Sequence, residues 1–287
     1  TVAQAAADEW TITPRAWMLF DGVVRPQGTD TTANGTITAP DSAGATEAEP
    51  FNVVMYGGSV SYFSERAKTS FTLTALSGTG SETITQVQFE HLPSLVAVLT
   101  EQPTEFTRTD IELTGQRQLN SGIGLMFGVR YENFDGTGLT TRHVVSDDPT
   151  NDYLLLSDGT LTYDAYSVRG GIAATSPPFV LDSKLYASLQ VFAGQRHQME
   201  KHANEREVDR TTGATVNIFS DVIFDRETSY FGPDVAVGLL LPLGNTVDLD
   251  FRYRTLIYYD FDSDRPNVEL DSPRVTHGLN VGLSIQF

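Results

Sequence analysis

The stretch VTHGLNVGLSIQF, residues 275–287, decides the fold. Its apolar side chains fall on alternate positions, at Val275, Leu279, Val281, Leu283, Ile285 and Phe287. Between them stand only Gly and small or uncharged polar residues. Because successive side chains of a β-strand point to opposite faces, this pattern predicts a strand with one apolar face and one small polar face.

The same alternation recurs along the whole chain in segments of about ten residues, the length that a tilted strand needs to cross a bilayer. The clearest copy is 246–259, where Leu249 and Phe251 share one face and Asp250 and Arg252 share the other. The other segments are 11–20, 52–63, 70–77, 107–116, 123–132, 163–174, 185–194 and 230–241. We therefore expect ten strands.

The links between these segments alternate in length, which favours an antiparallel up-and-down barrel. Short links lie at 64–68, 119–121, 176–183 and 242–245, and long links lie at 21–50, 78–105, 135–160, 195–229 and 260–274. We expect one all-β domain over 1–287, with 1–9 as an N-terminal segment on the short-turn side. Residues 215–224 could form a hairpin arm, so eight to twelve strands fit the pattern.

Residues 275–287 resemble the closing strand of Gram-negative outer-membrane proteins, which alternates apolar and aromatic residues up to a terminal Phe. The resemblance implies a transmembrane β-barrel in the bacterial outer membrane, with both termini and the short turns in the periplasm. It also implies five long extracellular loops, contact with outer-membrane lipid and lipopolysaccharide, and insertion by the barrel-assembly machinery.

A soluble β-sandwich is the alternative that alternation alone leaves open. Aromatic residues near the segment ends favour the barrel, because such rings form girdles at the membrane surface. They are Trp10, Trp17, Tyr62, Phe63, Tyr131, Tyr258 and Tyr259.

Composition removes several classes of function. A net charge of -18 argues against a nucleic-acid partner, which needs a basic surface. The absence of Cys excludes disulfides, thiolate metal sites and Cys nucleophiles. No apolar run is long enough for a membrane-spanning helix.

The charged face of the predicted strands would point into the barrel. These candidate lumen-lining residues are Arg15, Arg108, Asp110, Glu112, Arg130, Glu132, Arg169, Asp248, Asp250, Arg252 and Arg254. They favour a narrow porin-like channel for small polar solutes. The alternative is a network of ion pairs that fills a closed barrel, which would act as a scaffold, adhesin or partner-binding protein through its extracellular loops.

An outer-membrane hydrolase is the remote alternative. Ten strands also resemble the omptin proteases, for which Asp147, Asp148, His143 and His197 would be the candidates, but their order and spacing match no omptin motif. For a lipid-modifying enzyme only His277 is suggestively placed, and it has no evident partner Ser. We therefore assign no catalytic residues and expect no enzyme activity.

Metal sites are weakly indicated, and we expect no cofactor. His197, Glu200 and His202 lack the spacing of a zinc-binding helix. Calcium candidates are Asp260, Asp262, Asp264 and Asp271, although Arg265 stands where a calcium loop needs Gly.

One long link carries apolar residues at helical spacing. Leu92, Leu95, Val96, Val98 and Leu99 predict a short amphipathic helix within 78–105. It would constrict the barrel mouth, pack on the rim or contact a partner protein.

Overall fold

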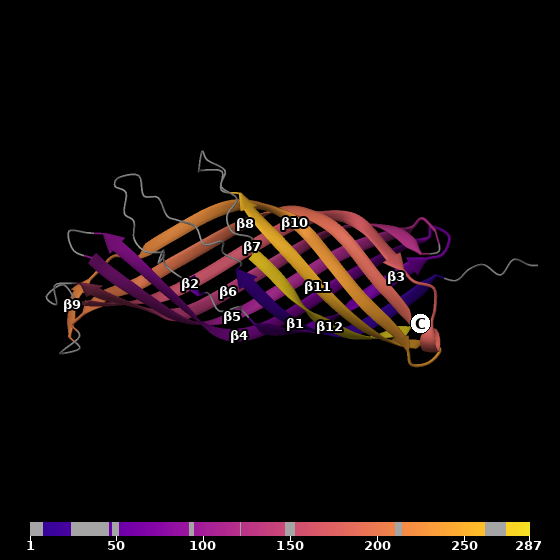
Figure 1. The fold of residues 1–287 in the computed structure, drawn as a ribbon, viewed down its shortest axis with the longest axis horizontal. Coiled ribbons are helices and arrows are strands. Elements are labelled where there is room, and N and C mark those ends of the chain that lie inside the picture. The colour runs from indigo at the N-terminus through magenta and orange to yellow at the C-terminus, as the bar shows by residue number, and fades with distance from the viewer. Residues whose placement is uncertain are drawn as a thin grey trace, which may run out of the picture.

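The computed structural model describes residues 8–23, 46–47, 52–91, 95–120, 122–146, 153–209, 214–261 and 274–287. Within these ranges ten antiparallel strands form a closed ring (Figure 1). In ring order they are β1 (Glu9–Val23), β3 (Val53–Ser64), β4 (Thr69–His91), β5 (Leu95–Gln118), β6 (Ile123–Ser146), β7 (Tyr153–Thr175), β8 (Lys184–Val208), β10 (Val222–Pro242), β11 (Val247–Phe261) and β12 (Arg274–Gln286). The predicted fold is confirmed, and each of the ten predicted segments lies in one ring strand to within one residue at its ends.

Ring closure comes from the pairing of the first strand with the last, from Thr11 opposite Gln286 to Val23 opposite Arg274. Strand β8 pairs directly with β10, so β9 stands outside the ring. Because every ring strand has two neighbours, the backbone groups that face lipid are hydrogen-bonded within the sheet.

Four connections are short, as predicted, and they gather at the end of the barrel where the C-terminus lies (Figure 1). The widest of them, between β7 and β8, holds a single 3-10 turn, Val180–Asp182. In the described part of the chain, no helix is long and apolar enough to cross a membrane.

The outward faces of the strands form an apolar belt. On β6 the outward residues are Ile123, Leu125, Phe127 and Val129, all exposed, and the belt ends at Tyr131. Beyond it the outward residues become polar, beginning with Asn133 and Asp135. The same change follows Tyr166 on β7, whose ring packs 5.0 Å from that of Tyr131. Exposed apolar surface of this extent needs a lipid environment, with the tyrosines at its boundary.

Three of the predicted long loops are largely strand, which corrects the loop boundaries. Strands β4 and β5 pair up to His91 opposite Leu95, across the predicted loop 78–105. Likewise β6 and β7 extend through most of 135–160, and β8 and β10 through most of 195–229. Beyond the apolar belt both faces of a strand contact water. The alternation of apolar and polar residues therefore fades, although the backbone pairing continues.

The predicted amphipathic helix is wrong for its described part, because 95–99 belong to β5 and pair with 87–91 of β4. Of the predicted loop 21–50, residues 21–23 extend β1 and Thr46–Glu47 forms β2, which pairs with β4 outside the ring. The predicted arm within 215–224 is present in part as β9 (Thr215–Ile218), which pairs with β8. In loop 260–274, residues 262–273 lie outside the described ranges.

The belt predicts a depth-dependent response to charge. Val129→Arg, at an outward position inside the belt, should destabilise the folded barrel by about 2–4 kcal/mol, because the guanidinium would face hydrocarbon. Thr107→Arg, at an exposed outward position beyond the belt, should cost about 0–1 kcal/mol. Urea unfolding of both variants in lipid vesicles measures the difference, and equal costs would contradict the position of the belt.

Candidate functional site: the charged interior of the barrel

The inward faces of the strands carry most of the chain's buried charge. Of the predicted lumen-lining residues, Arg108, Asp110, Arg130, Glu132, Arg169 and Asp250 are at most 5% exposed. Arg15, Glu112 and Arg254 are also mostly buried. Because burying an unpaired charge is costly, the contacts of these groups decide what the interior can do.

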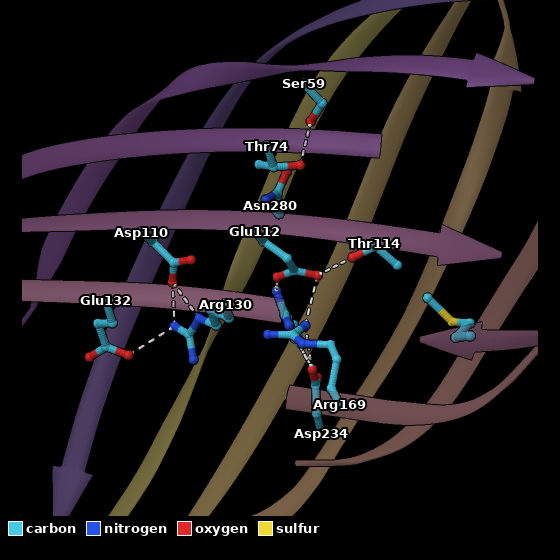
Figure 2. A network of polar contacts seen from close by, with 12 residues as sticks. Ser59, Thr74, Asp110, Glu112, Thr114, Arg130, Glu132, Arg169, Asp234 and Asn280 are labelled. Atoms are coloured by element: carbon cyan, nitrogen blue, oxygen red, sulfur yellow. Dashed lines mark hydrogen bonds and ion pairs between the residues drawn. The ribbon is translucent and has the colours of Figure 1, made fainter. Parts of the chain in front are cut away.

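A four-residue ring of ion pairs lies in the middle of this interior (Figure 2). Arg169 on β7 pairs with Glu112 on β5 at 2.7 Å and with Asp234 on β10 at 3.2 Å. Arg254 on β11 pairs with the same two carboxylates, at 2.9 Å and 2.6 Å. Each acid therefore meets two guanidinium groups, and each guanidinium meets two acids.

One of these contacts spans the lumen. Strands β5 and β11 stand on opposite sides of the ten-strand ring, yet Arg254 Nη1 reaches Glu112 Oε2. The two side chains thus meet across the full width of the barrel. At that level the side chains fill the interior instead of lining an open passage.

A second cluster lies beside this ring, on β5 and β6. Arg130 binds Asp110 through its Nε at 2.8 Å and its terminal nitrogen, and it also contacts Glu132 at 3.1 Å. Glu132 accepts a further hydrogen bond from Arg108 at 2.8 Å. Figure 2 shows Arg130 between the two carboxylates.

An aromatic layer covers the charged layer on the side away from the short turns. The rings of Phe106, Phe134 and Tyr163 stack in series at 5.1 and 5.2 Å. Phe192 and Tyr230 pack around Tyr258 at 5.0 and 5.7 Å. The hydroxyl of Tyr163 donates to Glu132 at 2.6 Å, so the two layers are joined by hydrogen bonds.

Interior glycines make room for these rings. A Cβ on Gly80 would lie 2.5 Å from the ring of Phe106, and one on Gly194 would lie 2.8 Å from that of Tyr230. The aromatic rings therefore extend over glycine backbone, where no Cβ stands in their way. The sequence prediction that Trp17 and Tyr258 belong to a membrane girdle is wrong, because both are 2% exposed and face this interior.

The third charged cluster lies nearest the short turns. Asp250 pairs with Arg15 at 2.9 Å and with Arg252 at 3.1 Å, so one carboxylate serves two guanidinium groups. Asp248 shares their strand face but is only half-buried, with Gln286 at 3.5 Å. It contributes to the rim rather than to the network.

Sequence reasoning missed Asp234, which is fully buried and central to the ion-pair ring. The signal was available, because Asp234 falls on the parity opposite to Val235 and Val237 within the segment 230–241. It also missed Arg196, which pairs with Asp260 at 3.1 Å and stacks between the rings of Tyr163 and Tyr230.

The candidate catalytic and metal-binding residues do not come together in one site. His197 faces outward and contacts Asp225 at 2.7 Å, with both side chains exposed. His277 faces outward between Tyr253 and Phe20. Asp147 and Asp148 lie outside the described residues, as do Asp262, Asp264 and Asp271, and the side chains of His143 and Glu200 are not described. His202 is buried. Among the side chains described, no group of three or more potential metal ligands forms.

A closed ten-strand ring with an apolar belt and a polar interior defines the class of outer-membrane β-barrels. Solved structures of similar fold include the outer membrane protease OmpT from Escherichia coli, with TM-score 0.48, 9% identity, and coverage of 100% of this chain and 99% of that one. The attachment invasion locus protein Ail of Yersinia pestis gives a TM-score of 0.31 and 12% identity, over 98% of this chain and 100% of that one.

OccAB3 of Acinetobacter baumannii gives a TM-score of 0.23 and 11% identity, over 98% of this chain and 99% of that one. No family model and no curated protein matches the sequence. The likeness concerns fold alone, so function has to be inferred from this chain's own residues.

The ion-pair ring predicts a large cost for removing one of its acids. Asp234→Asn leaves Arg169 and Arg254 to share Glu112, and we expect it to destabilise the barrel by about 3–5 kcal/mol. The matched change Asp225→Asn breaks the exposed pair with His197 and should cost at most about 1 kcal/mol. Urea unfolding in vesicles compares the two, and similar losses would mean that the buried charges are not coupled.

Proposed function

We propose that this protein is a closed outer-membrane barrel that acts at the cell surface, as a scaffold or partner-binding protein, and not as a solute channel. The observation that carries this proposal is the ion pair between Arg254 and Glu112, which joins opposite walls of the lumen. Sequence reasoning favoured a pore because it could identify the charges but not their partners.

Two further observations support closure. The aromatic layer lies directly against the charged layer, so a solute would meet two filled levels in succession. The charges of the four-residue ring also neutralise one another, whereas a conducting passage needs groups left free to replace the hydration of a solute. An open path would require several buried ion pairs to separate together.

The working surface, on this proposal, is a wall of strand beyond the belt. On β6 the wall runs from Asn133 to the strand end at Ser146, roughly 45 Å of strand at about 3.3 Å per residue. Strands β4, β5, β7, β8 and β10 rise beside it, whereas β1, β3, β11 and β12 are much shorter (Figure 1). Paired strands hold their positions better than free loops do, which suits a recognition surface.

Contacts within the wall support its rigidity. Asn133 donates a hydrogen bond to Asp164 at 3.1 Å, between neighbouring strands. Asp221 of the arm accepts a hydrogen bond from the backbone N–H of Asn204 on β8 at 3.2 Å and pairs with Lys201 on β8 at 3.3 Å. These two contacts lower the pKa of Asp221 and hold the arm against β8.

A closed lumen predicts that the barrel does not conduct ions. The folded wild-type barrel should give no discrete conductance steps in a planar lipid bilayer, because the lumen is bridged. The double variant Glu112→Ser, Arg254→Ser removes the bridge while Arg169 and Asp234 still neutralise each other. The aromatic layer remains in this variant, so we expect it to stay silent as well. Discrete conductance steps from the folded wild type would overturn the proposal.

The wall also predicts an orientation, with the arm outside the cell and the short turns in the periplasm. The chain has no Cys, so single Cys residues report without background. A membrane-impermeant maleimide should label Asn217→Cys on intact cells, because β9 is exposed on the arm. It should label Gly244→Cys, in a short turn with open space around it, only after the outer membrane is permeabilised. The reverse pattern would contradict this orientation.

A further inference from the structure

A cavity of about 190 Å³ lies inside the barrel on the short-turn side of the ion-pair ring. Ser61, Ser70 and Gln116 line it close to the turns, and Glu112, Asp234 and Arg254 line its far end. The bridge between β5 and β11 therefore closes one end of the cavity. The side chain of Arg252 lines it and is still 32% exposed, so the cavity reaches solvent.

The carboxylates that line this cavity are already neutralised. Asp110 is held by Arg130, and Glu112 and Asp234 are each held by two guanidinium groups of the ring. The guanidinium of Arg252 differs, because among the described side chains only the carboxylate of Asp250 lies within ion-pair distance of it, and that carboxylate is shared with Arg15. Asp248 is not part of the lining and lies nearer the rim. The cavity thus offers one incompletely compensated positive charge.

Polar groups without partners gather around the same cavity. Within the described part of the chain, Gln190 is 4% exposed and its Oε1 accepts no hydrogen bond. The Nε of Arg252 and the Nε1 of Trp17 donate none there. All three atoms are buried within residues that line the cavity, so its wall is polar but incompletely hydrogen-bonded.

The remaining walls can accept a hydrocarbon part. The guanidinium carbon of Arg252 lies over the ring of Tyr186, 4.8 Å from its centroid, and the sulfur of Met126 lies 3.8 Å from the Tyr186 hydroxyl. Both Tyr186 and Met126 line the cavity. A guanidinium that lies over an aromatic ring still directs its N–H groups outward to a carboxylate, and the ring and thioether beside it offer apolar contact.

We propose that this cavity is a binding site for a small organic carboxylate, which enters from the short-turn end. Its carboxylate binds Arg252, and its apolar part packs beside Tyr186 and Met126. The site is a one-ended pocket rather than a passage, because Arg254 and Glu112 close it. It is separate from the surface wall on which the proposed function depends.

Benzoate is a suitable probe, because it offers the carboxylate and a flat apolar group. The chain has two Trp, so Trp10→Phe leaves Trp17, inside the cavity, as the reporter of fluorescence. The folded barrel in detergent should show a saturable change on titration with benzoate. Its neutral analogue benzamide should bind at least about tenfold more weakly, because the contact with a charged, partly desolvated guanidinium is lost.

Variants show whether the fluorescence change comes from benzoate bound in the cavity. Arg252→Gln should weaken benzoate binding about tenfold, Arg252→Lys should retain part of it, and Arg117→Gln, at an exposed outward position, should leave it unchanged. Folding of each variant is checked by the mobility shift of unheated samples in gels. Saturation-transfer NMR on the wild type, with benzoate against benzamide, gives a second result that needs no variant.

Three results would overturn the site: no saturable response of the wild type to benzoate, equal binding of benzamide, or unchanged binding by folded Arg252→Gln. None of them bears on closure, since a silent barrel can lack the pocket ligand. Conductance of the wild type would in turn leave the benzoate result intact, so the two proposals fail separately.

Discussion

A charge buried inside a narrow barrel must find a partner of opposite sign, and this constraint shapes the rest of the molecule. A ten-strand ring is only slightly wider than one that side chains fill completely, so an arginine from one wall reaches a carboxylate on the other. Once the pairs form, the lumen is occupied. Glycines at facing positions and stacked rings then complete the filling on the far side.

Occupation of the lumen moves function to the two ends of the barrel. At one end six strands continue well past the apolar belt and form a wall, whereas the strands on the other side of the ring stop early. At the short-turn end the ion-pair ring forms the floor of a small polar cavity. The network thus separates an outer surface suited to recognition from an inner pocket suited to a small molecule.

Period-two alternation was sufficient to predict all ten ring strands and the four short turns, because in lipid one face of each strand must be apolar. Beyond the apolar belt a strand needs no apolar face, so alternation no longer predicts it. The helical spacing at 95–99 predicts a helix, whereas these residues pair in β5. The alternation also identified which charged residues face inward, but it did not predict that Glu112 contacts Arg254. That contact depends on ring order and shear, which become fixed only when Thr11 pairs with Gln286 and β8 with β10.

The central claim is that paired charges close the interior, and a high-resolution experimental density map of the barrel in a lipid nanodisc tests it most directly. The account predicts continuous side-chain density from Glu112 to Arg254, with Arg130 held between Asp110 and Glu132. Ordered water should appear only on the two sides of that layer. A continuous water-filled path past these residues, with their side chains against the wall, would contradict the account.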